Sequence, residues 1–85
     1  MIKILKFTAT WCKPCKILDP ILLKLKESHE DIVIEPIDID DFSEMASEYK
    51  IRSVPTLIFL KDQQEKQRIS GVQTLENLER ILVNL

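Results

Sequence analysis

The sequence predicts an α/β fold whose elements follow one another as strand, helix, strand, helix, strand, strand and helix. Short runs rich in β-branched and aromatic residues, such as residues 2–8 and 56–61, are typical of strands. Between such runs, apolar residues recur at helical spacing, most clearly over residues 12–29. A chain of 85 residues has room for one core, so we expect a single domain over residues 1–85.

The N-terminal half is predicted to contain two strands and a long helix. Residues 2–8 read as the first strand, and residues 9–11 form the loop that follows it. Residues 12–29 read as the helix and residues 31–37 as the second strand. The apolar stripe of the helix consists of Leu18, Ile21, Leu22 and Leu25.

The C-terminal half begins with a short helix, because Asp41 and Glu44 have the spacing of a capping box. Residues 56–61 and 65–70 are predicted to form a hairpin around the three residues between them. Gly71 ends this hairpin, and Thr74 is placed to cap the last helix. The residues expected to face inward from that helix are Leu75, Leu78, Ile81 and Leu82.

Composition excludes several classes of function. The net charge is −2, and no basic stripe is present to neutralise phosphates, so we expect no nucleic-acid partner. No apolar stretch is long enough to span a membrane. The start of the chain reads as a strand and lacks the pattern of a secretory signal. Together with only two cysteines, this predicts a cytoplasmic protein in a reducing compartment.

The most informative motif is the run Trp-Cys-Lys-Pro-Cys at residues 11–15. Cys12 and Cys15 are three residues apart at the predicted start of a helix, a spacing that permits a disulfide. The N-terminal end of a helix stabilises negative charge, which favours the thiolate of Cys12. The motif therefore predicts thiol–disulfide exchange.

Two other interpretations of the dithiol stay open. A structural disulfide would close only a four-residue loop and would stabilise the fold by about 2 kcal/mol. A zinc or iron–sulfur site would need ligands from a second chain, because the sequence has only two Cys and one His, His29. We expect no metal and no cofactor.

Two groups of polar residues are interpreted as structural. His29, at the end of the long helix, is expected to interact with the helix dipole. An acidic group fits no calcium-binding loop and predicts a solvated helix start. Its members are Asp38, Asp40, Asp41 and Glu44.

The sequence resembles the thioredoxin family from about Ile2 to its C-terminus. The family's Trp-Cys-Gly-Pro-Cys-Lys site reads Trp-Cys-Lys-Pro-Cys-Lys at residues 11–16, and the family's helix proline matches Pro20. The family's Ile-Arg-x-(Ile/Val)-Pro-Thr segment is Ile-Arg-Ser-Val-Pro-Thr at residues 51–56, and its glycine after the last strand matches Gly71.

The resemblance implies a minimal thioredoxin fold, a four-stranded mixed sheet flanked by helices in the order β-α-β-α-β-β-α. Larger members carry an additional N-terminal strand and helix, for which this chain has no residues. Residues 31–37 would therefore form an edge strand, where Pro36 removes no needed N–H and Glu35 discourages pairing with another chain. The charged residues 65–68 would form the opposite edge.

The motif residues also have expected roles. Cys12 is the expected nucleophile, because the first helical position places it outermost and nearest the backbone N–H groups. Cys15, one turn deeper, is the expected resolving thiol that attacks the mixed disulfide. Pro14 restrains the turn between them. Trp11, Lys13 and Pro14 are expected to flank the dithiol and contact the substrate. The alternative for Trp11 is a place in the core as a buried aromatic residue.

Val54 and Pro55 have two interpretations. A trans proline at the start of a strand is common and needs no function. The resemblance instead implies a cis Val54–Pro55 bond beside the dithiol, with the Val54 backbone presented for strand-like pairing with an extended substrate.

The sequence departs from the family pattern near the dithiol. Lys13 replaces the usual glycine and adds a positive charge beside Cys12. Lys6 stands where the family has a buried Asp, and Pro36 stands where the family has the Lys that partners it. Lys6 either faces the dithiol and favours its thiolate form or extends to solvent with little effect.

We therefore expect a monomeric protein disulfide reductase that acts on client proteins and is recycled by a flavin-dependent, NADPH-fed thioredoxin reductase. One alternative is a glutaredoxin-like enzyme that uses glutathione, although glutaredoxins generally carry Tyr or Phe in or beside their motif. Another alternative is a thioredoxin fold used as a binding subunit of a larger enzyme, which would need neither cysteine.

Overall fold

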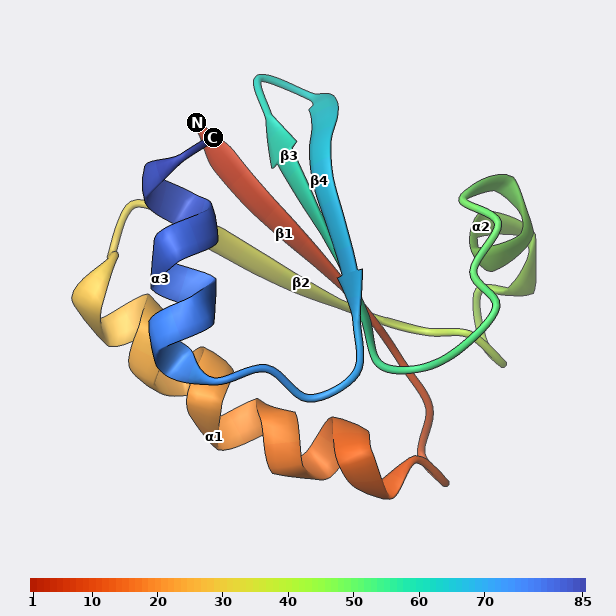
Figure 1. The fold of residues 1–85 in the computed structure, drawn as a ribbon. Helices are drawn as coiled ribbons and strands as arrows, with labels where there is room; N and C mark the ends of the chain where they lie inside the picture. Colours follow the sequence, from red (N-terminus) through yellow and green to blue (C-terminus); the bar gives the residue numbers. More distant parts are fainter.

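The computed structural model describes all of residues 1–85 and places the elements in the predicted order (Figure 1). The four strands form one sheet in the order β2-β1-β3-β4, in which β1 pairs parallel with β2 and the other pairs are antiparallel. This mixed sheet with flanking helices confirms the predicted fold class. The elements are β1 (Ile2–Thr8), α1 (Lys13–Ser28), β2 (Val33–Asp38), α2 (Ser43–Glu48), β3 (Thr56–Lys61), β4 (Gln64–Ser70) and α3 (Leu75–Val83).

The helices α1 and α3 cover one face of the sheet. Leu18, Leu22 and Leu25 of α1 and Leu78 and Leu82 of α3 join strand residues in the largest buried cluster. Alternation along β1 sends Ile4 into this cluster and Leu5 and Phe7 to the other face. None of the helices combines the length and apolar content that crossing a bilayer requires.

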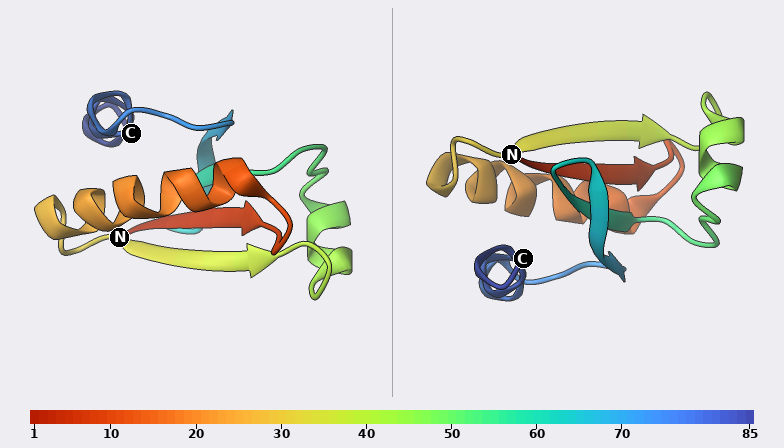
Figure 2. Two further views of the ribbon diagram at one scale, coloured as in Figure 1. Left: turned by 90° about the horizontal axis from the view of Figure 1, so that it is seen from below. Right: turned by 90° about the horizontal axis from the view of Figure 1, so that it is seen from above.

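The second face of the sheet carries a smaller core. Leu5 and Phe7 pack there with Ile37 and Ile58, and residues of α2 lie against them. Figure 2 shows α2 beyond the carboxyl ends of β1 and β2. At this end of the sheet the ring of Tyr49 lies 5.5 Å from that of Phe7. The loops beside α2 are thereby fixed next to the point where β1 leads into α1.

The two edge strands are those that the sequence predicted, β2 and β4. Pro36 lies in β2, where a missing N–H is tolerated. Nearly all of β4 is exposed. Its pairing with β3 shifts between Phe59 and Leu60, which leaves Lys66 of β4 as the extra residue of a β-bulge. Charge and a bulge together discourage pairing with another chain.

Some predicted boundaries were wrong. Cys12 and His29 are the caps of α1 rather than helical residues, and β2 begins two residues later than predicted. The N-cap of α2 is Phe42 and no side chain caps it, so the predicted capping box at Asp41 does not form. The reason is that Asp38 accepts the amides that follow it and turns the chain before α2 begins.

The hairpin between β3 and β4 is tighter than predicted. Only Asp62 and Gln63 form the turn, with φ of 52° and 71°, and Gln64 already belongs to β4. Two residues with positive φ suit the twist of a two-residue hairpin even without glycine. The predicted cap of α3 is confirmed, since the Thr74 hydroxyl accepts the amide of Asn77 at 3.1 Å.

Candidate functional site: a dithiol at the start of α1

The two cysteines lie where β1 ends and α1 begins. The amide of Cys12 donates to the carbonyl of Ala9 at 3.1 Å, which closes a turn after β1. Cys12 keeps an extended backbone and forms the N-cap of α1. Pro14 occupies the first turn of the helix, where its missing N–H has no intrahelical partner to lose.

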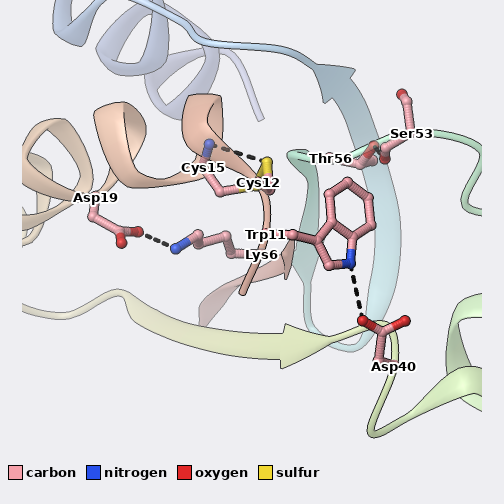
Figure 3. Close-up of a disulfide and its surroundings, with 8 residues drawn as sticks. All are labelled: Lys6, Trp11, Cys12, Cys15, Asp19, Asp40, Ser53 and Thr56. Carbon is pink, nitrogen blue, oxygen red and sulfur yellow. Dashed lines mark hydrogen bonds and ion pairs between the residues drawn. A yellow bond between two sulfur atoms is a disulfide. The ribbon is translucent and has the colours of Figure 1, made fainter. Parts of the chain in front are cut away.

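Cys12 and Cys15 form a disulfide with their Cα atoms 5.4 Å apart, which confirms that the spacing permits the bond. The amide of Cys15 donates to the Sγ atom of Cys12 at 3.2 Å (Figure 3). The sulfur of Cys12 therefore meets both a hydrogen-bond donor and the positive end of the helix dipole. Both interactions favour the thiolate over the thiol once the disulfide is reduced.

Three separate segments enclose the disulfide. Cys12 and Cys15 are only 3% and 1% exposed and pack with Ala9. Ile39, from the loop after β2, and Val54, from the loop before β3, pack against this group. The disulfide is therefore almost completely covered by these segments.

The Val54–Pro55 bond is cis in the structure. The hydroxyl of Thr56 donates to the carbonyl of Ser53 at 2.7 Å, and the amide of Gly71 donates to the carbonyl of Pro55 at 2.9 Å. No backbone hydrogen bond within the chain uses the N–H or the carbonyl of Val54. An unpaired backbone donor and acceptor thus lie beside the disulfide.

Trp11 stands at the rim of the site with 65% of its surface exposed. Its Nε1–H donates to Asp40 at 3.0 Å, and Figure 3 shows the indole between the dithiol and that carboxylate. Asp38 in turn accepts the amides of Asp40 and Asp41 at 2.8 and 3.4 Å. The acidic residues thus build the loop that orients Trp11, a role that the sequence analysis missed.

Lys6 adopts neither of the two arrangements expected for it. It is buried, with 7% of its surface exposed, and forms an ion pair with Asp19 of α1. Figure 3 shows the ammonium group directed at Asp19, one helical turn beyond Cys15. The pair borders an open hollow of about 370 Å³ that Leu22 and Pro36 also line. The sequence contained one signal for Asp19, its i, i+4 spacing from Cys15 on the same helix face.

No group of three or more His, Cys, Asp or Glu side chains is placed to hold a metal ion. His29 lies far along α1 from the dithiol, and its Nε2 atom is 3.8 Å from the carboxylate of Glu79.

Comparison with known proteins gives a consistent result. The family model described as Thioredoxin matches residues 1–84. The chain is 35% identical over 80 residues to thioredoxin H3 of Arabidopsis thaliana, a match that covers 91% of this chain and 68% of that protein. It is 37% identical over 79 residues to a thioredoxin of Chlamydia caviae, covering 93% and 78% of the two chains.

Solved structures are similar over nearly the whole chain. Mitochondrial thioredoxin 3 of Saccharomyces cerevisiae, in its oxidised form, superposes with a TM-score of 0.90 at 32% identity, over 99% of this chain and 78% of that one. Thioredoxin NaTrxh of Nicotiana alata superposes with a TM-score of 0.90 at 30% identity, over 98% and 71% of the two chains.

Proposed function

We propose that the two cysteines of this chain carry out different steps of its reaction. The chain belongs to the thioredoxin family and acts by thiol–disulfide exchange. The Cys12 thiolate attacks one sulfur of a client disulfide. A bond forms between Cys12 and that sulfur, and the client's other sulfur leaves as a thiolate that takes a proton from water. Cys15, as thiolate, then attacks Sγ of Cys12 and releases the client's remaining sulfur. Two electrons pass to the client, and the Cys12–Cys15 disulfide remains.

The observation that carries this division is the hydrogen bond from the Cys15 amide to the sulfur of Cys12. Cys12 is the N-cap, so its sulfur meets the helix N-terminus, whereas Cys15 lies inside the first turn. Solvent exposure does not indicate which cysteine reacts first, because both side chains are nearly fully buried.

Substitution of each cysteine tests the division. Cys15→Ser should accumulate mixed disulfides with clients, whereas Cys12→Ser should abolish reduction. Alkylation of the reduced wild type at neutral pH, followed by peptide mapping, should modify Cys12 first. Preferential modification of Cys15 would reverse the assignment.

Client docking is the second part of the proposal. The free N–H and carbonyl of Val54 support pairing with an extended segment of the client, as when a peptide adds to a strand. Pro55 holds this segment beside the dithiol, and Trp11, Lys13 and Pro14 line the approach to Cys12. All three are exposed, so each is free to contact a client.

The third part concerns the source of electrons. Thioredoxin reductase, a flavoenzyme fed by NADPH, is our proposed donor, and the cytoplasm, a reducing compartment, is our proposed location. Insulin reduction driven in parallel by dithiothreitol, by NADPH with thioredoxin reductase, and by glutathione separates the donors. Turnover with glutathione but not with the reductase would favour a glutaredoxin-like enzyme instead.

Lys6 is proposed to tune the dithiol. Its ammonium group is buried next to the helix that carries both cysteines, so it favours negative charge on them. Asp19 offsets part of that charge because it lies on the same helix. The pair therefore sets thiol reactivity by the balance between two opposite charges.

A further inference from the structure

A second concave surface lies beside the client-docking segment. It is an open groove of about 330 Å³ between the loop that precedes β3 and the strand β4. Lys50, Arg52 and Arg68 supply three cations to its lining, and no acidic residue lines it. We call it the cationic groove. The hydroxyl-bearing residues of its wall are Ser53, Thr56 and Ser70.

Two of the three cations have no ionic partner. Arg68 is held by Glu65 through bonds of 2.8 and 2.9 Å, and it donates to the carbonyl of Tyr49 at 2.6 Å. The hydrogen bond with Glu65 raises the pKa of Arg68, so this cation stays charged. Lys50 and Arg52 take part in none of the ion pairs of the structure. The groove therefore carries uncompensated positive charge in a protein of net charge −2.

Hydrogen bonds order the backbone beside the groove and hold one of its three cations, Arg68. Lys50 has a φ of 56°, and its amide donates to the carbonyl of Ser47 at 3.0 Å. The next amide, that of Ile51, donates to the carbonyl of Ala46 at 2.9 Å. The guanidinium of Arg68 is anchored on the same turn through Tyr49. A partner therefore meets a surface whose backbone is already ordered, which lowers the entropy lost on binding.

The groove is continuous with the segment proposed to dock the client. Ser53 and Thr56 line the groove and flank Val54 and Pro55 in the sequence. Val54 itself packs against the cluster of Ala9 and the two cysteines. An extended peptide advances about 3.3 Å per residue. A client strand paired with Val54 therefore places side chains a few residues from its cysteine over the groove.

We infer that the cationic groove binds acidic side chains that flank the disulfide of a client, and that it thereby selects among clients. The inference rests on the proposed docking of the client at Val54. Carboxylates complement Lys50 and Arg52, and the exposed hydroxyls of Ser53 and Ser70 are donors for their oxygens. Complementary charge at the rim of an interface acts mainly on the rate of association, so the selectivity should appear in kcat/KM.

The test uses disulfide-linked peptide pairs that differ only in the residues flanking the cysteine, which are acidic, neutral or lysine. At low ionic strength we expect the reduced protein to reduce the acidic peptide about fivefold faster in kcat/KM than the neutral one, and the lysine peptide more slowly. About 0.5 M salt should largely remove these differences. Lys50→Gln with Arg52→Gln should bring the ratio of acidic to neutral rates close to one.

A matched control carries the same change in net charge away from the groove. Lys24→Gln with Lys66→Gln removes two exposed cations of α1 and β4 and should keep the acidic preference. Equal rates for acidic and neutral peptides in the wild type would overturn the inference. So would an equal loss of preference in the control variant. Failure of the wild type to reduce any peptide, or the uncharged 2-hydroxyethyl disulfide, would instead overturn the proposed reductase chemistry.

Discussion

Lys6 of β1 and Asp19 of α1 form an ion pair in which the cation is buried and the anion is not. The side chain of Lys6 is 8% exposed and that of Asp19 is 54% exposed. The pair joins the strand that precedes the dithiol to the helix that follows it. Because burial differs between the two partners, removing one should not have the same effect as removing the other.

The first prediction concerns stability. Asp19→Asn leaves a buried ammonium group without its counter-charge and should lower the free energy of unfolding by about 1–3 kcal/mol. Lys6→Leu leaves the carboxylate of Asp19, which water already solvates, and adds an apolar side chain near Leu22. This substitution should therefore lower the free energy of unfolding by less than about 1 kcal/mol. Urea unfolding of both variants measures the difference. Equal losses would show that Lys6 is not buried in solution.

The second prediction uses the same variants to test the tuning of the dithiol. Lys6→Leu removes a cation and leaves Asp19, so it should raise the apparent pKa of the reactive thiol and make the disulfide harder to reduce. Asp19→Asn should have the opposite effects. The pH dependence of alkylation and the redox equilibrium with dithiothreitol give both quantities. If neither variant changes the thiol pKa or the redox equilibrium, the ion pair of Lys6 and Asp19 has only a structural role.

A third prediction concerns Trp11 and its acceptor. Asp40→Ala removes the only bond that holds the indole N–H and should let the ring reorient, which time-resolved tryptophan anisotropy detects. Stability should fall by less than about 1 kcal/mol because both groups are exposed. Reduction of a protein client should slow about two- to threefold, while 2-hydroxyethyl disulfide should react as before. Asp41→Ala, which removes the same charge without touching Trp11, is the control.

The fourth prediction concerns the pH dependence of stability. The hydrogen bond from Arg68 lowers the pKa of Glu65 from its usual 4.5. The pair therefore stabilises the folded state above the pKa of the unfolded state, and this contribution disappears as the pH falls through the lowered folded-state value. At pH 7, Glu65→Gln should lower the free energy of unfolding by about 0.5 kcal/mol. The effect is small because solvent screens the ion pair. The difference in unfolding free energy between the variant and the wild type should vanish at acidic pH. A difference that stays constant with pH would show that the stabilisation by Glu65 is not ionic.

The parts of the fold that the sequence predicted are those set by local physics. The strand-forming run of β1 and the hydroxyl of Thr74 act within a few residues, and the strand and the helix cap were both predicted correctly. The dithiol belongs to the same class, because i, i+3 spacing at a helix start brings Cys12 and Cys15 together without help from the rest of the chain.

The parts that were missed depend on contacts between elements or on competing turns. Asp38 accepts the amides of Asp40 and Asp41, and the Asp41 amide is the one that Glu44 would accept in a capping box, so α2 starts later than the capping pattern indicates. Gln63 accepts a positive φ although glycine is the usual residue there, so the hairpin is shorter than its sequence indicates. Asp40 and Asp19 reach their partners only after the strands and helices have packed.

The hydrogen bond between the Cys15 amide and the sulfur of Cys12 has a spectroscopic consequence. The sulfur of Cys12 both caps α1 and is the proposed nucleophile, so a change in its charge acts directly on the amide whose hydrogen bond it accepts. A thiolate accepts a hydrogen bond more strongly than the sulfur of a disulfide does. The Cys15 amide proton should therefore move downfield and exchange more slowly when Cys12 is reduced and ionised. Its chemical shift, followed against pH by NMR, serves as an internal indicator of the charge on the sulfur of Cys12.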